Sequence, residues 1–337
     1  MLYSLLSEEV RKSINREPSP PFFGSPTMAY LRKSRYARKT RRTPRRYVKT
    51  TRKTRYVRKR RPVMTKRRIL NATSTKKRNT MLQLANTSTG TGGPVTIGPG
   101  PYLVNAGNGN NISLFCTTAM DLNNSVNNPN VISQQASRTA TTCYIRGFSE
   151  KIRIQTSSGI PWFWRRICFR ARGQMFAGFS PSDTPTQTNG GATSYTETSN
   201  GMQRLYFNLT INASNQTLYN IQQVLFRGQF NSDWVDPQTA AVDTTRVDLV
   251  SDNRMTIRSG NQAGTVKDVT MWHPYNHNLV YDDDESGAAE ATTYLSVQDK
   301  RGNGDMYIFD LFTAGTGGTA SDVLQLTSTS TLYWHEK

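Results

Sequence analysis

The sequence predicts an all-β protein: an antiparallel eight-stranded jelly-roll sandwich with long loops, one short helix and a disordered basic N-terminal arm. Short runs rich in β-branched and aromatic residues recur from about residue 100 to the end, and segments rich in Gly, Asn, Ser, Thr and Pro separate them. The strand–helix–strand alternation typical of a parallel sheet is missing. An all-β region of roughly 230 residues is an acceptable size for a single sandwich.

Eight segments are expected to form strands, because each combines β-forming residues with a period of two or with a continuous apolar run. In the second of them, Ile152 and Ile154 point to one side of the strand while Arg153 and Gln155 point to the other. The expected strands are 111–118, 142–157, 162–172, 203–211, 246–260, 265–274, 305–313 and 330–337.

One segment of this region, 216–228, has the residue spacing of a helix. Its apolar side chains fall on one stripe, and Gly228 is expected to end the helix. The stripe consists of Leu218, Ile221, Val224 and Leu225.

Two polar loops, 118–138 and 180–201, are longer than the usual connections of a compact domain. Loops of this length are usually functional or disordered. Because no catalytic motif accompanies them, we expect them to contact neighbouring copies of the chain or to lie on an outer surface.

Positive charge is concentrated in one part of the chain. The 337 residues carry a formal net charge of +20, and residues 28–78 contain 23 basic residues and no acidic one. The first 27 residues are neutral, and the chain from Asn79 onward has 17 basic and 20 acidic residues. The expected organisation is therefore an N-terminal extension without an assigned role (1–27), a basic arm (28–78), a flexible Gly-rich connector (79–110) and the jelly-roll domain (111–337).

The basic arm is expected to bind nucleic acid. It has too little apolar surface to fold alone, and a polyanion would relieve the repulsion among its charges. Neutralised phosphates release counterions, which gives binding that is sensitive to salt and independent of sequence. Membrane binding is the rival, but no apolar helical face accompanies the charges. The expected DNA contacts in this arm are Arg32, Lys33, Arg35, Arg38, Lys39, Arg41, Arg42, Arg45, Arg46, Lys49, Arg52, Lys53, Arg55, Arg58, Lys59, Arg60, Arg61, Lys66, Arg67 and Arg68.

Nuclear import is a second use of the same charges, since an import signal needs only a short basic run. The segment "KRRILNATSTKKR" is the candidate, and host import machinery is the expected partner. The residues expected to carry the signal are Lys66, Arg67, Arg68, Lys76, Lys77 and Arg78.

The segment "GIPWFWRRICF" allows two interpretations. Trp162 and Trp164 are most simply core residues of a sandwich. Alternatively, their rings stack unpaired bases while Arg165 and Arg166 hold phosphates, and on this basis both arginines are candidate DNA contacts.

Catalytic and metal-binding motifs are missing. The Gly-rich stretches lack the Lys and Ser or Thr of a phosphate-binding loop. His273 and His277 are four residues apart, but Pro274 breaks the helix that would align them. The acidic run 282–285 lacks the calcium-loop pattern, and we expect a solvated loop or a patch that meets an arginine of a neighbouring copy. We therefore expect no enzyme, no cofactor and no metal.

The three cysteines are expected to be reduced core thiols. They are far apart in the sequence, odd in number and set in apolar surroundings, which suits neither disulfides nor a zinc site. They are Cys116, Cys143 and Cys168.

Four stretches resemble the capsid proteins of genomoviruses of the gemycircularvirus type and, more distantly, the coat proteins of geminiviruses. The residues before Met28 have no counterpart in this resemblance, because such capsid proteins typically begin near "MAY". The matching stretches are "MAYLRKSRYARKTRR", "TKRRILNATSTKKRNTML", "IQTSSGIPWFWRRICF" and "HPYNHNLVYDDDESG".

The resemblance implies a jelly-roll subunit that assembles into a small icosahedral shell and packages circular single-stranded DNA, with the virion and the host nucleus as its locations. If about 60 copies close the shell, their arms bring roughly 1,400 positive charges to a similar number of phosphates. The alternative is a cellular structural protein with a basic tail, of ribosomal or chromatin type. Such proteins often carry basic charge on the folded part too. Here the chain from Asn79 onward has more acidic than basic residues, which favours the capsid interpretation.

Overall fold

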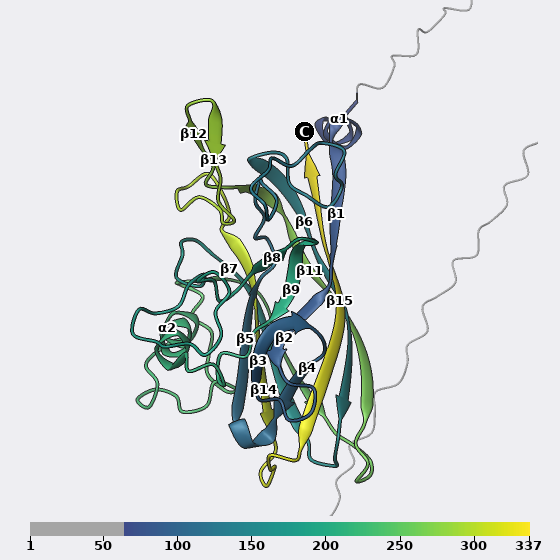
Figure 1. Ribbon diagram of the computed structural model, residues 1–337, viewed down its shortest axis with the longest axis vertical. Coiled ribbons are helices and arrows are strands. Elements are labelled where there is room, and N and C mark those ends of the chain that lie inside the picture. The colour runs from purple at the N-terminus through teal and green to yellow at the C-terminus, as the bar shows by residue number, and fades with distance from the viewer. Residues whose placement is uncertain (1–63) are drawn as a thin grey trace, which may run out of the picture. The chain divides into compact units, whose positions relative to one another are not determined.

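A computed structural model describes residues 64–337, and its long strands form two antiparallel sheets that face one another (Figure 1). The predictions made for residues 1–63 lie outside the described residues. Sheet I has the order β1-β15-β6-β11, and β4 pairs with β15 as well. Its strands are β1 (Thr75–Met81), β15 (Val323–Glu336), β6 (Thr142–Thr156), β11 (Val266–Val280) and β4 (Tyr102–Asn105).

Sheet II has the order β10-β7-β14-β5. Numbered one to eight along the chain, the long strands of the two sheets stand in the orders 1-8-3-6 and 5-4-7-2, which is the arrangement of a jelly roll. The predicted fold class is confirmed. The strands of sheet II are β10 (Asp248–Ile257), β7 (Trp162–Ala171), β14 (Asp305–Ala314) and β5 (Asn110–Cys116).

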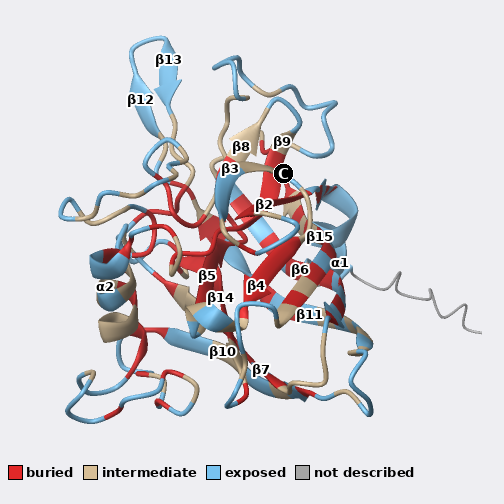
Figure 2. Ribbon diagram, turned by 60° about the horizontal axis from the view of Figure 1, so that its bottom comes forward, coloured by how far each residue is buried: buried red, intermediate tan, exposed pale blue. Residues whose placement is uncertain are grey.

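Smaller elements complete the described part of the chain. Sheet III has the order β3-β2-β9-β8, and β12 and β13 form a separate exposed hairpin (Figure 2). No helix of residues 64–337 is long and apolar enough to cross a membrane. The remaining elements are α1 (Lys66–Thr73), β2 (Gln83–Thr87), β3 (Pro94–Pro99), η1 (Ala106–Asn108), β8 (Thr196–Thr198), β9 (Gly201–Tyr206), α2 (Asn215–Leu225), β12 (Asp284–Ser286) and β13 (Ala289–Ala291).

The two main sheets differ in how many of their faces are covered. In β6 of sheet I, Ile152 and Ile154 are buried while Arg153 and Gln155 are exposed, so the predicted alternation is confirmed. In β14 of sheet II, by contrast, the first eight residues are all buried. Sheet II is therefore covered on both faces, and a strand buried on both faces has a continuous apolar sequence.

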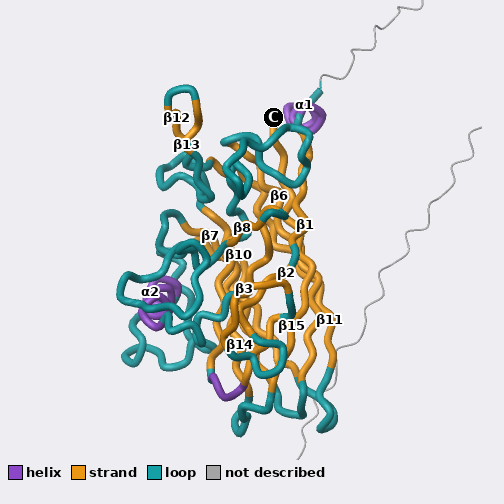
Figure 3. Tube along the Cα trace, in the orientation of Figure 1, coloured by secondary structure: helices purple, strands orange, loops and turns teal. Residues whose placement is uncertain are grey.

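Helix α2 and the loops around it cover the outer face of sheet II (Figure 3). The helix was predicted, and its stripe residues Ile221 and Leu225 are buried. The next residue, Phe226, is extended and its ring packs edge to face on Phe309 of β14 at 5.9 Å. The helix ends three residues before Gly228, because Phe226 turns into this contact.

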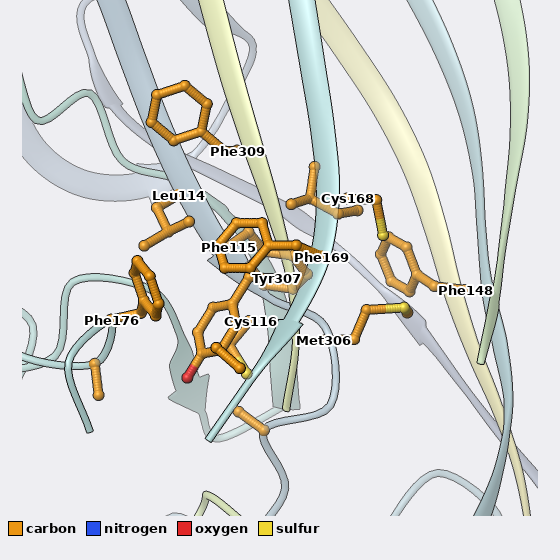
Figure 4. Packing of buried hydrophobic residues seen from close by; sticks show 14 of the residues in the cluster. Leu114, Phe115, Cys116, Phe148, Cys168, Phe169, Phe176, Met306, Tyr307 and Phe309 are labelled. Atoms are coloured by element: carbon orange, nitrogen blue, oxygen red, sulfur yellow. The ribbon is translucent and has the colours of Figure 1, made fainter. Parts of the chain in front are cut away.

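The core fills both sides of sheet II (Figure 4). Phe148, Cys168 and Met306 lie on one side of the sheet, and Leu114 and Phe309 lie on the other. The three predicted core thiols are all buried and free. Burial raises the pKa of Cys168 to about 12, so this thiol is protonated and unreactive near neutral pH.

The prediction of a flexible connector at 79–110 is wrong. Leu84 and Ala85 in β2 are buried, and so are Tyr102 and Val104 in β4. Strand β2 pairs in parallel with β9, and β4 pairs with β15. The apolar runs of β2 and β4 are short and lie between Gly-rich turns. Strands that are distant in the sequence supply their hydrogen-bond partners.

Candidate nucleic-acid interface

The predicted basic residues fall into four groups along the chain. Those from 32 to 61 lie outside the described residues. Lys66, Arg67 and Arg68 belong to α1, where the Thr65 side chain accepts a hydrogen bond from the Arg68 backbone N–H at 3.4 Å and so caps the helix. Lys66 and Arg68 are exposed. The basic segment thus leads along the chain into a capped helix and then directly into an edge strand of sheet I.

Lys76, Lys77 and Arg78 lie on strand β1, which alternates between exposed and buried positions. Lys76 and Arg78 are exposed on the outer face of sheet I. Lys77 points inward, where its Nζ lies 2.9 Å from a carboxylate oxygen of Glu336 and 2.8 Å from Thr139 Oγ1. The expectation that Lys77 contributes to an import signal is therefore wrong for the folded domain, because its ammonium group is enclosed. Lys76 and Arg78 remain accessible.

Arg165 is enclosed by sheet II and its covering loops, although it was a candidate for DNA contact. Its guanidinium group lies 2.7 Å from Asp252 and donates to the Pro237 carbonyl at 2.6 Å. The residue has no exposed surface. The structure corrects the expectation, because Arg165 is buried and pairs with Asp252, so no phosphate can reach its guanidinium group.

Arg166 lies on the other side of β7, between the two sheets. It makes a two-pronged contact with Asp310, at 2.7 Å and 2.8 Å, and it also pairs with Glu150 of β6. This arginine is likewise not a DNA contact. Trp162 and Trp164 are buried, so the core interpretation of this segment is confirmed. Only Phe163 of the group is exposed, on the opposite face of β7.

Glu150, Arg166, Arg204 and Asp310 form a buried four-charge network that joins the sheets. Arg204 Nε donates to Glu150 at 2.8 Å, and its Nη2 lies 3.2 Å from Asp310. Burial alone would raise the pKa of Glu150, but the two guanidinium groups outweigh it and lower that pKa to about 2. Two cations and two anions therefore balance inside the sandwich, and this network serves the fold.

The acidic run 282–285 is divided between two environments. Asp283 is enclosed and forms a two-pronged ion pair with Arg138 of the same chain, at 2.5 Å and 3.0 Å. Asp284 and Glu285 are exposed in the β12–β13 hairpin. The expected arginine partner thus belongs to this chain, and the exposed residues Asp282, Asp284 and Glu285 agree with the expected solvated loop.

His273 and His277 lie on strand β11 and do not converge. His273 is buried between the sheets and His277 is exposed, because the strand is irregular between Pro274 and His277. Within residues 64–337, no three His, Cys, Asp or Glu side chains meet as metal ligands do.

The outer face of sheet I, defined as the side chains that point away from sheet II, carries most of the accessible charge of the long strands. Five cationic residues lie on it, and Asp268 is its single acid. Arg153 pairs with Asp268 at 2.8 Å, which leaves four cations without an acidic partner among the described residues. The five are Lys76, Arg78, Arg146, Lys151 and Arg153.

Hydroxyl groups lie among these charges. Thr80 of β1 and Thr331 of β15 are cross-strand partners whose hydroxyl oxygens lie 3.3 Å apart. Thr327 and Thr329 continue this row along β15, next to Arg153 and Lys151. Cations and hydroxyls together are the donors that contact phosphates in nucleic-acid complexes.

The sequence interpretation missed Arg146, Lys151 and Arg153 as members of one surface. A signal was present, because the alternation that predicted the strand also places Lys151 and Arg153 on a single polar side. What the sequence could not supply was the neighbouring strand β1, whose charges were attributed to the flexible arm.

No family model matches the chain, and no curated protein is found to be similar to it. The fold, the charge of the basic segment and the cationic outer face of sheet I are therefore the observations that can support a functional proposal.

Proposed function

We propose that the protein is a viral capsid protein that assembles into a small icosahedral shell and packages circular single-stranded DNA. The observation that carries the proposal is the separation of charge. Residues 28–61 hold 17 basic residues and no acidic one, whereas the chain from Asn79 onward is slightly acidic. We call residues 28–61 the tail. A jelly roll that carries one such charged tail suits a container whose subunits hold nucleic acid on one side.

The cationic outer face of sheet I supports the same proposal. The basic segment runs through α1 into β1, and β1 places Lys76 and Arg78 on this face. Tail and face are thus continuous along the chain and of the same charge. The proposal therefore includes contacts of the packaged DNA with both the tail and this face.

The proposal includes passage through the host nucleus, with import machinery as a partner. Lys66, Arg68, Lys76 and Arg78 are accessible for recognition, and Lys77 is not. Retention of the full-length protein in the cytoplasm of a host cell would contradict this part.

Deletion of residues 28–61 tests packaging, because it spares α1 and β1. Particles of the full chain are expected to contain nuclease-protected circular single-stranded DNA, and particles of the deletion variant are expected to contain almost none. The slope of log K against log salt for single-stranded DNA should become shallower by about 0.7 for each phosphate that the deletion variant no longer neutralises. Electron microscopy, nuclease digestion and salt titration measure these results.

A second variant keeps the length of the tail and removes its charge: every Lys and Arg from 32 to 61 becomes Gln. It should behave like the deletion if charge is what packages DNA. Full DNA content in either variant would contradict the proposal. A full chain that remains a stable monomer with and without DNA would favour a cellular protein with a basic tail.

A further inference from the structure

We infer that Trp272 and Tyr333, on the outer face of sheet I, form a platform that stacks the unpaired bases of a single nucleic-acid strand. This inference rests on the proposed function and adds how the folded domain itself holds the strand. It concerns two rings and three cations that the structure brings together from four strands.

The two rings meet above a glycine. Trp272 on β11 and Tyr333 on β15 flank β6 from opposite sides, and their ring centroids are 5.9 Å apart. Gly147 of β6 lies between them, since it pairs with Tyr333 on one side and with Pro274 on the other. A Cβ atom at Gly147 would lie 2.7 Å from the indole ring, so only glycine leaves room for the ring at this position. Its φ of 151° also favours glycine.

The indole is unusually accessible for a tryptophan. Trp272 is 45% exposed, whereas the other four tryptophans are at most 8% exposed. The indole lies close to Gly147, because a Cβ atom at that glycine would be 2.7 Å from Cζ2 and 3.0 Å from Cη2 of the ring.

Cations surround the platform. Arg78 is the cross-strand partner of Tyr333, Arg146 precedes Gly147, and Lys151 lies two residues beyond Ser149, the partner of Trp272. The nearest acid on this face, Asp268, is already paired with Arg153. The charge favours a polyanion over a second copy of the same cationic face, because like charges would oppose each other across such an interface.

A second ring pair extends the platform. Tyr144 and His335 lie 5.8 Å apart, and His335 is two residues beyond Tyr333, about 7 Å along β15. Burial, and then the charges of Lys76 and Arg146, lower the pKa of His335, so these two cations lie close to the second ring pair. Two ring pairs in line, edged by cations, match the way proteins hold single strands: aromatic rings stack successive bases while positive side chains follow the backbone.

The test uses the full chain below the concentration at which light scattering detects particles, and it reads the fluorescence of the tryptophans of these unassembled subunits. The probes are the oligonucleotide dT20, a sugar–phosphate 20-mer without bases, and a 20-base-pair duplex. At about 0.5 M salt the contribution of the charged tail is reduced. We expect dT20 to quench the emission of Trp272 and the other two probes to leave it unchanged.

Substitutions assign the effect to the platform. Trp272→Phe should abolish the quenching and retain most of the affinity, since a ring remains. Trp272→Thr with Tyr333→Thr should lower the affinity for dT20 by about five-fold to 150-fold and leave that for the sugar–phosphate probe unchanged. Phe163→Thr, which removes a 39% exposed ring from sheet II, is the matched control and should change neither.

The outcomes distinguish this inference from the proposed function. Equal affinity for dT20 and the sugar–phosphate probe would overturn the platform and leave packaging by the tail intact. A double variant that binds dT20 normally and fails to form particles would assign this face to contacts between copies, which also overturns the inference. Failure of the full chain to bind any probe at low salt would overturn both.

Discussion

Glu150 lies between two arginines in the space that separates the sheets. It accepts from Arg204 at 2.8 Å and from Ser330 at 3.0 Å, and it also pairs with Arg166. Its removal would leave two buried guanidinium groups with a single carboxylate. Loss of one partner from a buried ion pair costs about 3–5 kcal/mol. The network therefore fixes how sheet I sits on sheet II.

His273 lies beside this network and gives the domain a pH-dependent stability. Burial, and then the charge of Arg166, lower its pKa to about 4. The unfolded chain has a histidine pKa of about 6.5, so between these values only the unfolded state binds the proton. The free energy of unfolding should therefore fall by about 3 kcal/mol as the pH drops from about 6.5 to about 4.

Denaturant unfolding of His273→Met subunits checks this prediction. The variant should lose most of the decline over that pH range, because it has no group to protonate. His277→Met, an exposed position on the same strand, should keep the decline of the parent protein. An unchanged decline in His273→Met would show that another group is responsible.

The roles of single residues were the least predictable from the sequence. Trp162 and Trp164 were correctly predicted as core, because large aromatics on a strand are usually buried. Arg165 and Arg166 were not, because their carboxylate partners, Asp252 and Asp310, lie 87 and 144 residues away. A buried arginine and an exposed one look the same in a local pattern, and only the fold determines which carboxylates are near.

At the scale of elements, β1 shows how an edge strand can carry charge. Its outward side chains are exposed, while its inward side chains are Lys77, Asn79 and Met81. The Asn79 side-chain amide donates to the Met202 carbonyl at 2.9 Å, and Lys77 is held by Glu336. Polar inward residues are accepted here because each one has a partner.

Matched substitutions in β1 test this account. Lys77→Met should lower the free energy of unfolding by about 3 kcal/mol, since it leaves the enclosed Glu336 carboxylate without its cation. Lys76→Met, one residue away and exposed, should change it by less than about 0.5 kcal/mol. Thermal and denaturant unfolding measure both, and equal stabilities of the two variants would contradict the assignment.

The element boundaries agree with the prediction where the hydrophobic period of the sequence is clear. They differ where pairing with another strand decides the boundary. The strand predicted at 265–274 continues to Val280, past Pro274. A proline is tolerated there because β11 is an edge strand that pairs only with β6, and an irregularity with Asn276 at positive φ re-establishes the pairing. Strand β1 was missed because its lysines and arginine have the composition of the arm.

At the scale of the whole molecule, the fold class could be predicted because strand period, turn residues and loop lengths all indicated a sandwich. The outer face of sheet I could not, since β1, β6, β11 and β15 come from distant parts of the sequence. The parallel pairing of β2 with β9 likewise depends on strands far apart in the chain. Such juxtapositions are set by tertiary packing.

The charge of the tails predicts how assembly should respond to salt. If about 60 copies form the shell, residues 28–61 bring about 1,000 positive charges together, and their repulsion opposes closure. At low salt and without DNA, the full chain should remain unassembled, whereas the variant without residues 28–61 should form closed particles. Light scattering and electron microscopy measure this difference. Efficient empty-shell formation by the full chain at low salt would contradict it.

Because helix and loops cover sheet II while sheet I is bare, the subunit has two unlike sides before it meets any other copy. A layer of such subunits, set edge to edge in one orientation, inherits that sidedness. One surface of that layer would carry the cations of sheet I, and the other would carry the helix and loops that cover sheet II. Substitutions in the covering loops would then alter one surface of the layer and leave the cationic surface unchanged.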